Sequence, residues 1–279
     1  MKTTKEKIQH IQTIFRHVQD SFSDSYTLQT LAENLGNYEI EFRSIAYEAA
    51  SMCIALQDFK TANELNRWHD FLNENSAHAT QIHVGLGWAL AQNEISPIEF
   101  LRQLEPVFGY RVLDGYGYYE GFFRRRKSIL NQQQPQWNDS TATGAYNQGL
   151  GRSLWYIHNG EIDAAKHALE KFPVERHKDL WRGLGIAIAY VGGCNEKMLR
   201  EVFIQSGLYK SQLATGAVMA LVSRHYANYI SDDTSLVCKV WLNKTSEEII
   251  LLNENLRSSL NLKADDAYKN WIEKLSCLL

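Results

Sequence analysis

The sequence predicts an all-α protein built from helical hairpins, a TPR-like α/α solenoid or array. Its 279 residues include only four prolines, few enough for long uninterrupted helices. Apolar residues recur mainly at three- and four-residue spacing, which is typical of amphipathic helices. A Gly-x-Gly followed by an apolar run also occurs four times, with spacings of 30, 34 and 34 residues. Such periods are typical of helix-turn-helix repeats, in which each hairpin buries its apolar face against its neighbours.

The repeated motif predicts one helix for each copy. Two degenerate copies extend the series on either side of the four complete ones. The six copies begin near residues 42, 84, 114, 147, 181 and 215. We expect a helix to start at each of these positions and the six helices to stack in chain order as one layer. A polar run at 131–136 interrupts the third of the six copies and indicates a connection rather than a mobile lid.

The position of the repeats divides the chain into three parts. We expect an N-terminal helical cap over residues 1–40, whose first helix covers about 4–20. A helical repeat domain follows over residues 41–230. A C-terminal helical cap of two or three helices closes the chain over residues 231–279.

Paired glycines at the start of predicted helices require an explanation, because glycine weakens a helix by about 1 kcal/mol relative to alanine. Without Cβ atoms, the first turns of neighbouring helices can pack backbone against backbone. Alternatively, the missing side chains leave room for a ligand against exposed N–H groups. The packing interpretation is favoured, because a helical repeat needs close packing at every copy and a ligand needs room at only one.

The composition excludes several classes of protein. The net charge of −3, from 29 basic and 32 acidic residues, gives no overall positive field, so we expect no nucleic-acid partner. No stretch is apolar enough to span a bilayer or to act as a signal peptide, which predicts a cytoplasmic protein. The four cysteines lie far apart without the spacing of a zinc site, and we expect reduced thiols rather than disulfides.

Motifs of the common cofactor sites are missing. The Gly-x-Gly copies lack the third glycine and the preceding strand of a dinucleotide-binding fingerprint. The chain also has no P-loop, no Gly-x-Ser-x-Gly elbow and no His-Glu-x-x-His motif. Its nine histidines show no pairing at four-residue spacing. We therefore predict no cofactor and no bound metal.

Two glutamates stand where the repeat otherwise has apolar residues. Glu120 occupies the position held by Leu90, Leu154 and Ile188 in the other complete copies, and Glu48 does the same in the first degenerate copy. Burial among aromatic side chains raises the pKa of a carboxyl group and makes it a candidate general acid or base. The alternative is that each carboxylate has a structural role and is held by an Arg or Tyr side chain. Because an unpaired buried carboxylate is costly, we expect Glu120 to be buried within reach of Arg152 or another cation.

Further polar and aromatic residues fall in the same blocks, and aligned helices bring them toward one surface. Asp114 and Asp179 also fit as N-caps, and capping is the favoured interpretation for these two residues. His83 is the one histidine at the head of a repeat helix. The predicted substrate-binding residues are Asp114, Tyr118, Tyr119, Gln148, Arg152, Trp155, Asp179, Trp181, His83 and Trp88.

The basic run Arg124–Lys127 lies near the predicted end of a helix. Cations there complement the helix dipole, so a solvated face is the favoured interpretation. The functional alternative is a docking site for an acidic partner such as an acyl carrier protein.

The blocks at 83–89, 114–123, 147–155 and 176–185 resemble the uncharacterised proteins encoded beside enediyne polyketide synthases, the UnbL-type family. The resemblance covers about residues 40–230 and implies a role in turning a polyene chain into an enediyne core or a related product. It implies no particular catalytic residue. The chain differs from that pattern in Asn147, where the family usually has an acid, and in Tyr119, where it usually has a histidine.

Three classes of function follow from these observations. The first is a cofactor-independent enzyme that holds an apolar polyketide in an aromatic-lined groove and moves protons with Glu120 or Glu48. The second is a chaperone that shields a reactive polyene in the same groove. The third is a helical-repeat scaffold that recruits other biosynthetic proteins, including a polyketide synthase or its carrier protein. We expect a hydrophobic small-molecule intermediate as the ligand, because the acids and aromatics cluster in the repeat helices.

Overall fold

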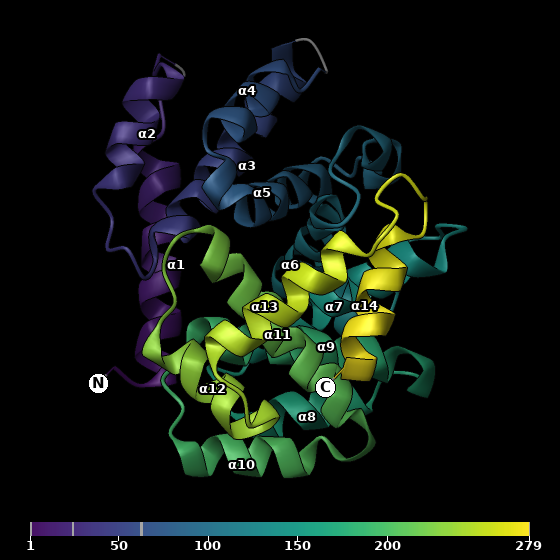
Figure 1. Ribbon diagram of the computed structural model, residues 1–279. Helices are drawn as coiled ribbons and strands as arrows, with labels where there is room; N and C mark the ends of the chain where they lie inside the picture. The colour runs from purple at the N-terminus through teal and green to yellow at the C-terminus, as the bar shows by residue number, and fades with distance from the viewer. Residues whose placement is uncertain (1, 24, 62–63, 279) are drawn as a thin grey trace.

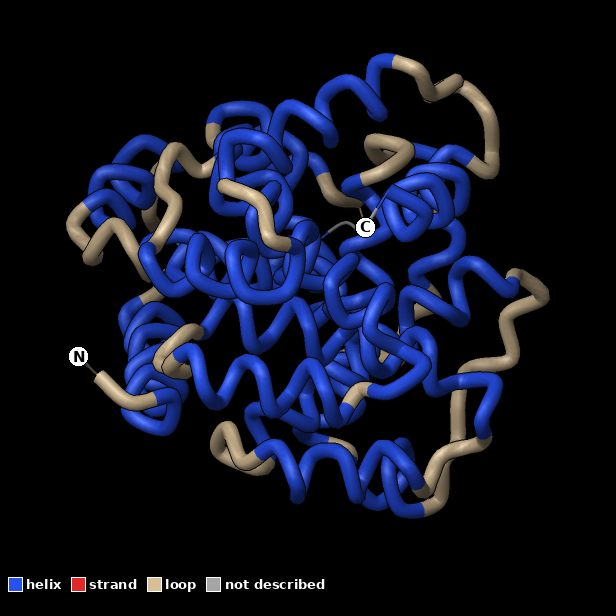
Figure 2. The backbone as a smooth tube through the Cα atoms, turned by 60° about the horizontal axis from the view of Figure 1, so that its bottom comes forward, coloured by secondary structure: helices blue, strands red, loops and turns tan. Residues whose placement is uncertain are grey.

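The computed structural model describes residues 2–23, 25–61 and 64–278. Figure 2 shows helices joined by loops, and the described ranges contain no strand. The predicted all-α class is confirmed. None of the helices in these ranges combines the length and the apolar character needed to cross a bilayer.

Six helices form the centre of the protein and pack against one another in chain order (Figure 1). They are α3 (Arg43–Thr61), α5 (Ala79–Gln92), α6 (Arg111–Phe123), α7 (Ser140–Ile157), α9 (Val174–Val191) and α11 (Lys210–Tyr226). The order of packing follows the prediction, but the starts of the last five helices were predicted three to seven residues too late. The paired glycines lie inside the helices, not at their first turns.

The glycines allow close packing of the helix backbones. In α7, a methyl group added at Gly149 would overlap the carbonyl oxygen of Asp114 in α6. A methyl group added at Gly151 would overlap the carbonyl oxygen of Leu180 in α9. Each Gly-x-Gly therefore contacts the preceding helix with its first glycine and the following helix with its second. The alternative of a ligand at these N–H groups is wrong, because N–H groups in the middle of a helix bond within the helix.

The layer of central helices curls, so that its last helix returns to the first two. Ser223 Oγ in α11 donates a hydrogen bond to Gln81 Oε1 in α5 at 2.7 Å. Arg224 in α11 donates to the carbonyl oxygens of Glu41, just before α3, at 3.1 Å and of Tyr190 in α9 at 2.6 Å. The contacts with Gln81 and Glu41 skip neighbours in the stack, whereas Tyr190 belongs to the neighbouring α9. Together they place the inner faces of α3, α5 and α9 around a common interior.

Shorter elements connect the central helices. The longer connectors are α4 (Asn66–Glu74), α8 (Ile162–Glu170) and α10 (Glu196–Gln205). The short ones are η1 (Ser76–His78), η2 (Pro97–Glu99), η3 (Leu101–Gln103), η4 (Phe108–Tyr110), η5 (Arg126–Leu130) and η6 (Gly207–Tyr209). The polar run at 131–136 follows η5, and Gln132 Nε2 donates to the carbonyl oxygen of Lys171 at 2.6 Å. This segment is a tethered connection, as predicted.

The two ends of the chain cover the stack from different sides (Figure 1). At the C-terminal end, α12 (Asp232–Leu242), α13 (Ser246–Ser258) and α14 (Ala267–Leu278) all contact α11. At the N-terminal end, α1 (Thr4–Ser21) packs on α3 and α2 (Leu28–Gly36) follows it. The buried amine of Lys7 fixes α1 in place, because it lies 2.6 Å from both the Glu41 and the Asp233 carboxylates.

Candidate functional site

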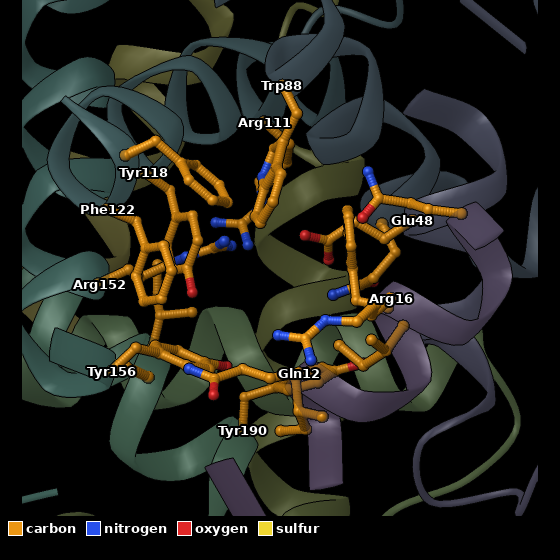
Figure 3. A pocket seen from close by; sticks show the side chains of 18 residues that line it. Gln12, Arg16, Glu48, Trp88, Arg111, Tyr118, Phe122, Arg152, Tyr156 and Tyr190 are labelled. Carbon is orange, nitrogen blue, oxygen red and sulfur yellow. The ribbon is translucent and has the colours of Figure 1, made fainter. Parts of the chain in front are cut away.

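A cavity of about 230 Å³ lies between α1 and the inner faces of the central helices. Figure 3 shows side chains from several helices pointing into it. Arg16 and Gln19 of α1 and Phe123 of α6 are exposed and mark the opening to solvent. The residues that line the cavity are Ile11, Gln12, Phe15, Arg16, Gln19, Ile45, Glu48, Gln81, Trp88, Arg111, Tyr118, Phe122, Phe123, Arg152, Tyr156, Ile186, Ala187 and Tyr190.

One wall of the cavity is aromatic. Trp88 is stacked between Phe15, at 4.4 Å between ring centroids, and Tyr118, at 5.0 Å. Tyr118 continues the wall through a stacked Phe122 at 5.8 Å and an edge contact with Tyr156 at 5.2 Å. Flat, polarisable side chains in a row suit an extended apolar ligand with π electrons. Trp88 and Tyr118, two of the predicted substrate-binding residues, both lie in this wall.

Glu48 brings a carboxyl group into this cavity (Figure 3). The residue is 5% exposed, and its carboxylate makes no hydrogen bond or ion pair with any residue in the described ranges. Burial raises the pKa of Glu48 to about 7, although the nearby Arg152 and Arg111 guanidinium groups lower it. Glu48 therefore has comparable populations of acid and base near neutral pH, as a proton-transfer group requires.

Two buried arginines face Glu48 and share another carboxylate. Arg111 Nη1 lies 3.1 Å from Asp114 Oδ2, and Arg152 Nη1 lies 2.9 Å from Asp114 Oδ1. Gln148 Nε2 also donates to Asp114 Oδ2, at 2.6 Å. Asp114 is completely buried within α6, so its predicted role as an N-cap is wrong. Its carboxylate compensates the charge of the two guanidinium groups.

The polar contacts continue from the cavity into the core. Arg182 Nε donates to Gln148 Oε1 at 2.6 Å, and Arg182 Nη2 lies 2.6 Å from Asp179 Oδ1. Tyr268 of α14 donates to Gln148 Oε1 at 3.4 Å. Asp179 is the sixth residue of α9, so it is not an N-cap either. These contacts fix the orientation of the Gln148 amide. Gln148 in turn holds the Asp114 carboxylate in contact with the guanidinium groups of Arg111 and Arg152.

The family model for a protein of unknown function, DUF1702, matches residues 1–277. The chain belongs to the DUF1702 family. No curated protein and no solved structure matches it.

Glu120 of this DUF1702 chain is buried, as predicted, but lies away from the cavity. It is 1% exposed and does not line the cavity. Its carboxylate pairs with Arg124 Nη1 at 2.8 Å and Lys127 Nζ at 3.3 Å. The predicted cationic partner is confirmed, whereas Arg152 pairs with Asp114 instead. The alignment with apolar positions predicted only that Glu120 is buried. It could not tell which buried side of α6 faces the cavity, because successive residues of a helix point in different directions.

The remaining predicted residues lie outside the cavity. Tyr119 contacts the edge of Trp88 and packs on Phe123. Trp155 and Trp181 are buried at 1% and 2% exposure and do not line the cavity. His83 is buried, its Nδ1–H donates to the carbonyl oxygen of Ala79 at 2.6 Å, and burial lowers its pKa to about 4. These side chains belong to the core around the site.

Arg111 and the residues of α1 that line the cavity were not among the predicted site residues. Arg111 stands three residues before Asp114, a spacing that places both side chains on one face of a helix. The helix was expected to begin at Asp114, so this pair was not recognised. The residues of α1 follow an ordinary amphipathic pattern. That pattern does not indicate that part of the apolar face lines a cavity and is not packed against another helix.

The side chains of the basic run lie at the rim of the cavity. Phe122 and Phe123 line both the cavity and a surface hollow formed with Arg124–Lys127. Arg125 and Arg126 are exposed and form no ion pair in the described part of the chain. The four cysteines are free thiols, and the described residues contain no group of three His, Cys, Asp or Glu side chains arranged for a metal.

Proposed function

We propose that this protein binds an apolar, conjugated polyketide intermediate in the cavity and exchanges a proton with it through Glu48. The observation that carries the proposal is an unpartnered, buried carboxyl group opposite an aromatic wall. In its ionised form Glu48 takes a proton from an allylic carbon, and in its acid form it returns one to a distant carbon of the conjugated chain. The double bonds shift without net oxidation, so the reaction needs no redox cofactor.

The biosynthetic setting of the proposal is the maturation of an enediyne-type product. Its support is the resemblance of the blocks at 83–89, 114–123, 147–155 and 176–185 to proteins encoded beside enediyne polyketide synthases. We also propose that the six central helices are copies of one helix-plus-connector unit. The support for this is that the paired glycines of α5, α6, α7 and α9 make equivalent contacts with the preceding and the following helix.

The test replaces Glu48 by Gln, which keeps the shape of the side chain but cannot exchange a proton. We expect Glu48→Gln to bind a conjugated tetraene methyl ester as the wild type does and to lose about a hundredfold or more in product formation. Binding is followed by the fluorescence of the tetraene with purified protein. Product is measured in a producing strain whose own gene is replaced by the variant.

Glu120→Gln is the matched control, because it makes the same change at a buried carboxyl group outside the cavity. It should retain product formation once the folded fraction, taken from a melting curve, is included. Full activity from a folded Glu48→Gln protein would remove the acid-base role and leave a chaperone that only shields the polyene. Failure of the wild type to bind the tetraene would remove the apolar ligand and favour the scaffold.

We further propose that an acidic acyl carrier protein docks on the basic run 124–127. Its support is the position of the exposed Arg125 and Arg126 beside Phe123 at the mouth of the cavity. Reversing both charges, Arg125→Glu with Arg126→Glu, should slow association by about tenfold and lower product formation, because the rim charges steer the encounter. Tetraene binding by the purified variant should not change. Unchanged product formation would remove this docking site.

A further inference from the structure

The charges around the cavity do not balance when Glu48 is protonated. Arg111 and Arg152 are 5% and 7% exposed, and both pair with the single carboxylate of Asp114. This buried group of two cations and one anion therefore carries one excess positive charge. Since unpaired charges in protein interiors are costly, a buried excess charge beside a cavity indicates an anion that completes the site.

The hydrogen-bond donors lead to the same conclusion. In the described chain Arg111 makes one side-chain hydrogen bond, from Nη1 to Asp114 Oδ2. Arg152 is in ion-pair contact with Asp114 Oδ1, but none of its N–H groups makes an aligned hydrogen bond within the described ranges. Both guanidinium groups thus present unused donors to the cavity that they line. Guanidinium groups arranged in this way bind planar or tetrahedral oxyanions through two parallel hydrogen bonds.

We infer that the cavity takes a ligand whose apolar chain ends in an anionic oxygen group, and that this end enters first and binds Arg111 and Arg152. This inference rests on the proposed function, because it names the class of ligand that the same cavity takes. The order of entry follows from burial: the two arginines lie at the closed end, whereas Phe123 and Arg16 lie at the opening. The aromatic wall of Trp88 and neighbouring rings then covers the apolar chain.

A carboxylate and a phosphate share the chemistry that two guanidinium groups recognise, so the experiment separates them. Decanoate, decyl phosphate and 1-decanol are titrated into the purified full-length protein by calorimetry. We expect one or both anions to bind at least about tenfold more tightly than the alcohol, since hydrogen bonds to a charged group are stronger than those to a neutral one. The tighter of the two anions identifies the head group.

The variant Arg152→Met should reduce the preference for the anion to about twofold or less while 1-decanol binding is retained. Arg257→Met is the matched control, because it removes a largely buried arginine that pairs with Glu105 outside the cavity. It should keep the full preference. If Arg152→Met does not fold, Arg111→Met removes the other guanidinium group, and the preference of the wild type stands as a test by itself.

Equal affinity of the wild type for decanoate, decyl phosphate and 1-decanol would overturn the inference and leave the proposed apolar site intact. An unchanged anion preference in a folded Arg152→Met and a folded Arg111→Met protein would also overturn it. Binding of neither anion nor alcohol, together with no binding of the tetraene ester, would overturn both proposals. Tight anion binding without binding of the tetraene would support this inference and remove the polyene.

Discussion

Replacing Gly149 by alanine is expected to destabilise the protein by about 3 kcal/mol, the upper end of the usual cost of overpacking. The added methyl group would overlap the carbonyl oxygen of Asp114 and press on the amide nitrogen of Tyr118. Both are backbone atoms of α6, so no side-chain rotation can relieve the contact. The measurement is the midpoint of urea unfolding, followed by circular dichroism.

Gly36→Ala is the matched control for this substitution. Gly36 ends α2, and a methyl group added there would meet no atom within 4 Å. Its replacement should be neutral or stabilise by up to about 1 kcal/mol, because alanine favours the helix over the unfolded chain. A Gly149→Ala protein as stable as Gly36→Ala would contradict the close backbone packing of α6 and α7.

The second large effect is a pH-dependent gain in stability from Glu48→Gln. The pKa of Glu48 is raised from 4.5 to about 7 by burial, although Arg152 and Arg111 oppose the shift. The folded protein therefore binds a proton that the unfolded chain releases, so this carboxyl group destabilises the fold as pH rises from about 4.5 to about 7. The shift corresponds to about 3 kcal/mol, present in full above that range.

The amide that the Glu48→Gln substitution introduces does not titrate. The variant should therefore equal the wild type near about pH 4.5 and exceed its free energy of unfolding by up to about 3 kcal/mol near about pH 8. Urea unfolding at a series of pH values measures this difference. Glu120→Gln should show the opposite sign near about pH 8, a loss of about 2 kcal/mol, because Arg124 and Lys127 lose their carboxylate partner. A pH-independent difference between Glu48→Gln and wild type would contradict a buried carboxyl group that titrates near neutrality.

The glycine pattern illustrates how far the sequence alone leads. The spacing of Gly85, Gly115, Gly149 and Gly183 predicted six helices that pack in order, and the structure has this order. The helix starts were predicted too late, because glycine was taken to mark the first turn. Glycine inside a helix is tolerated when a neighbouring backbone packs into the space that a side chain would occupy. The stabilisation from this close packing is visible only in the folded structure.

The two glutamates show a second limit of prediction from sequence. A carboxyl group in a position that is otherwise apolar is readable from sequence, and it marked both Glu48 and Glu120 as buried. Which of them faces a cavity depends on how α1 covers α3 and on how α11 returns to α5. These contacts join residues far apart in the chain, and no local pattern encodes them.

The sequence by itself determined the helical class, the order of the central helices and the burial of Glu48 and Glu120, because periodicity and residue type reflect local burial. Only the tertiary structure decided that Asp114 pairs with Arg111 and Arg152 and that Glu48 has no partner in the described chain. The physical reason is that charge pairing depends on distances of a few ångströms between different helices. Those distances depend on how closely and at what angle the helices cross. Backbone contacts at glycines, such as Gly149 against Asp114, set this crossing.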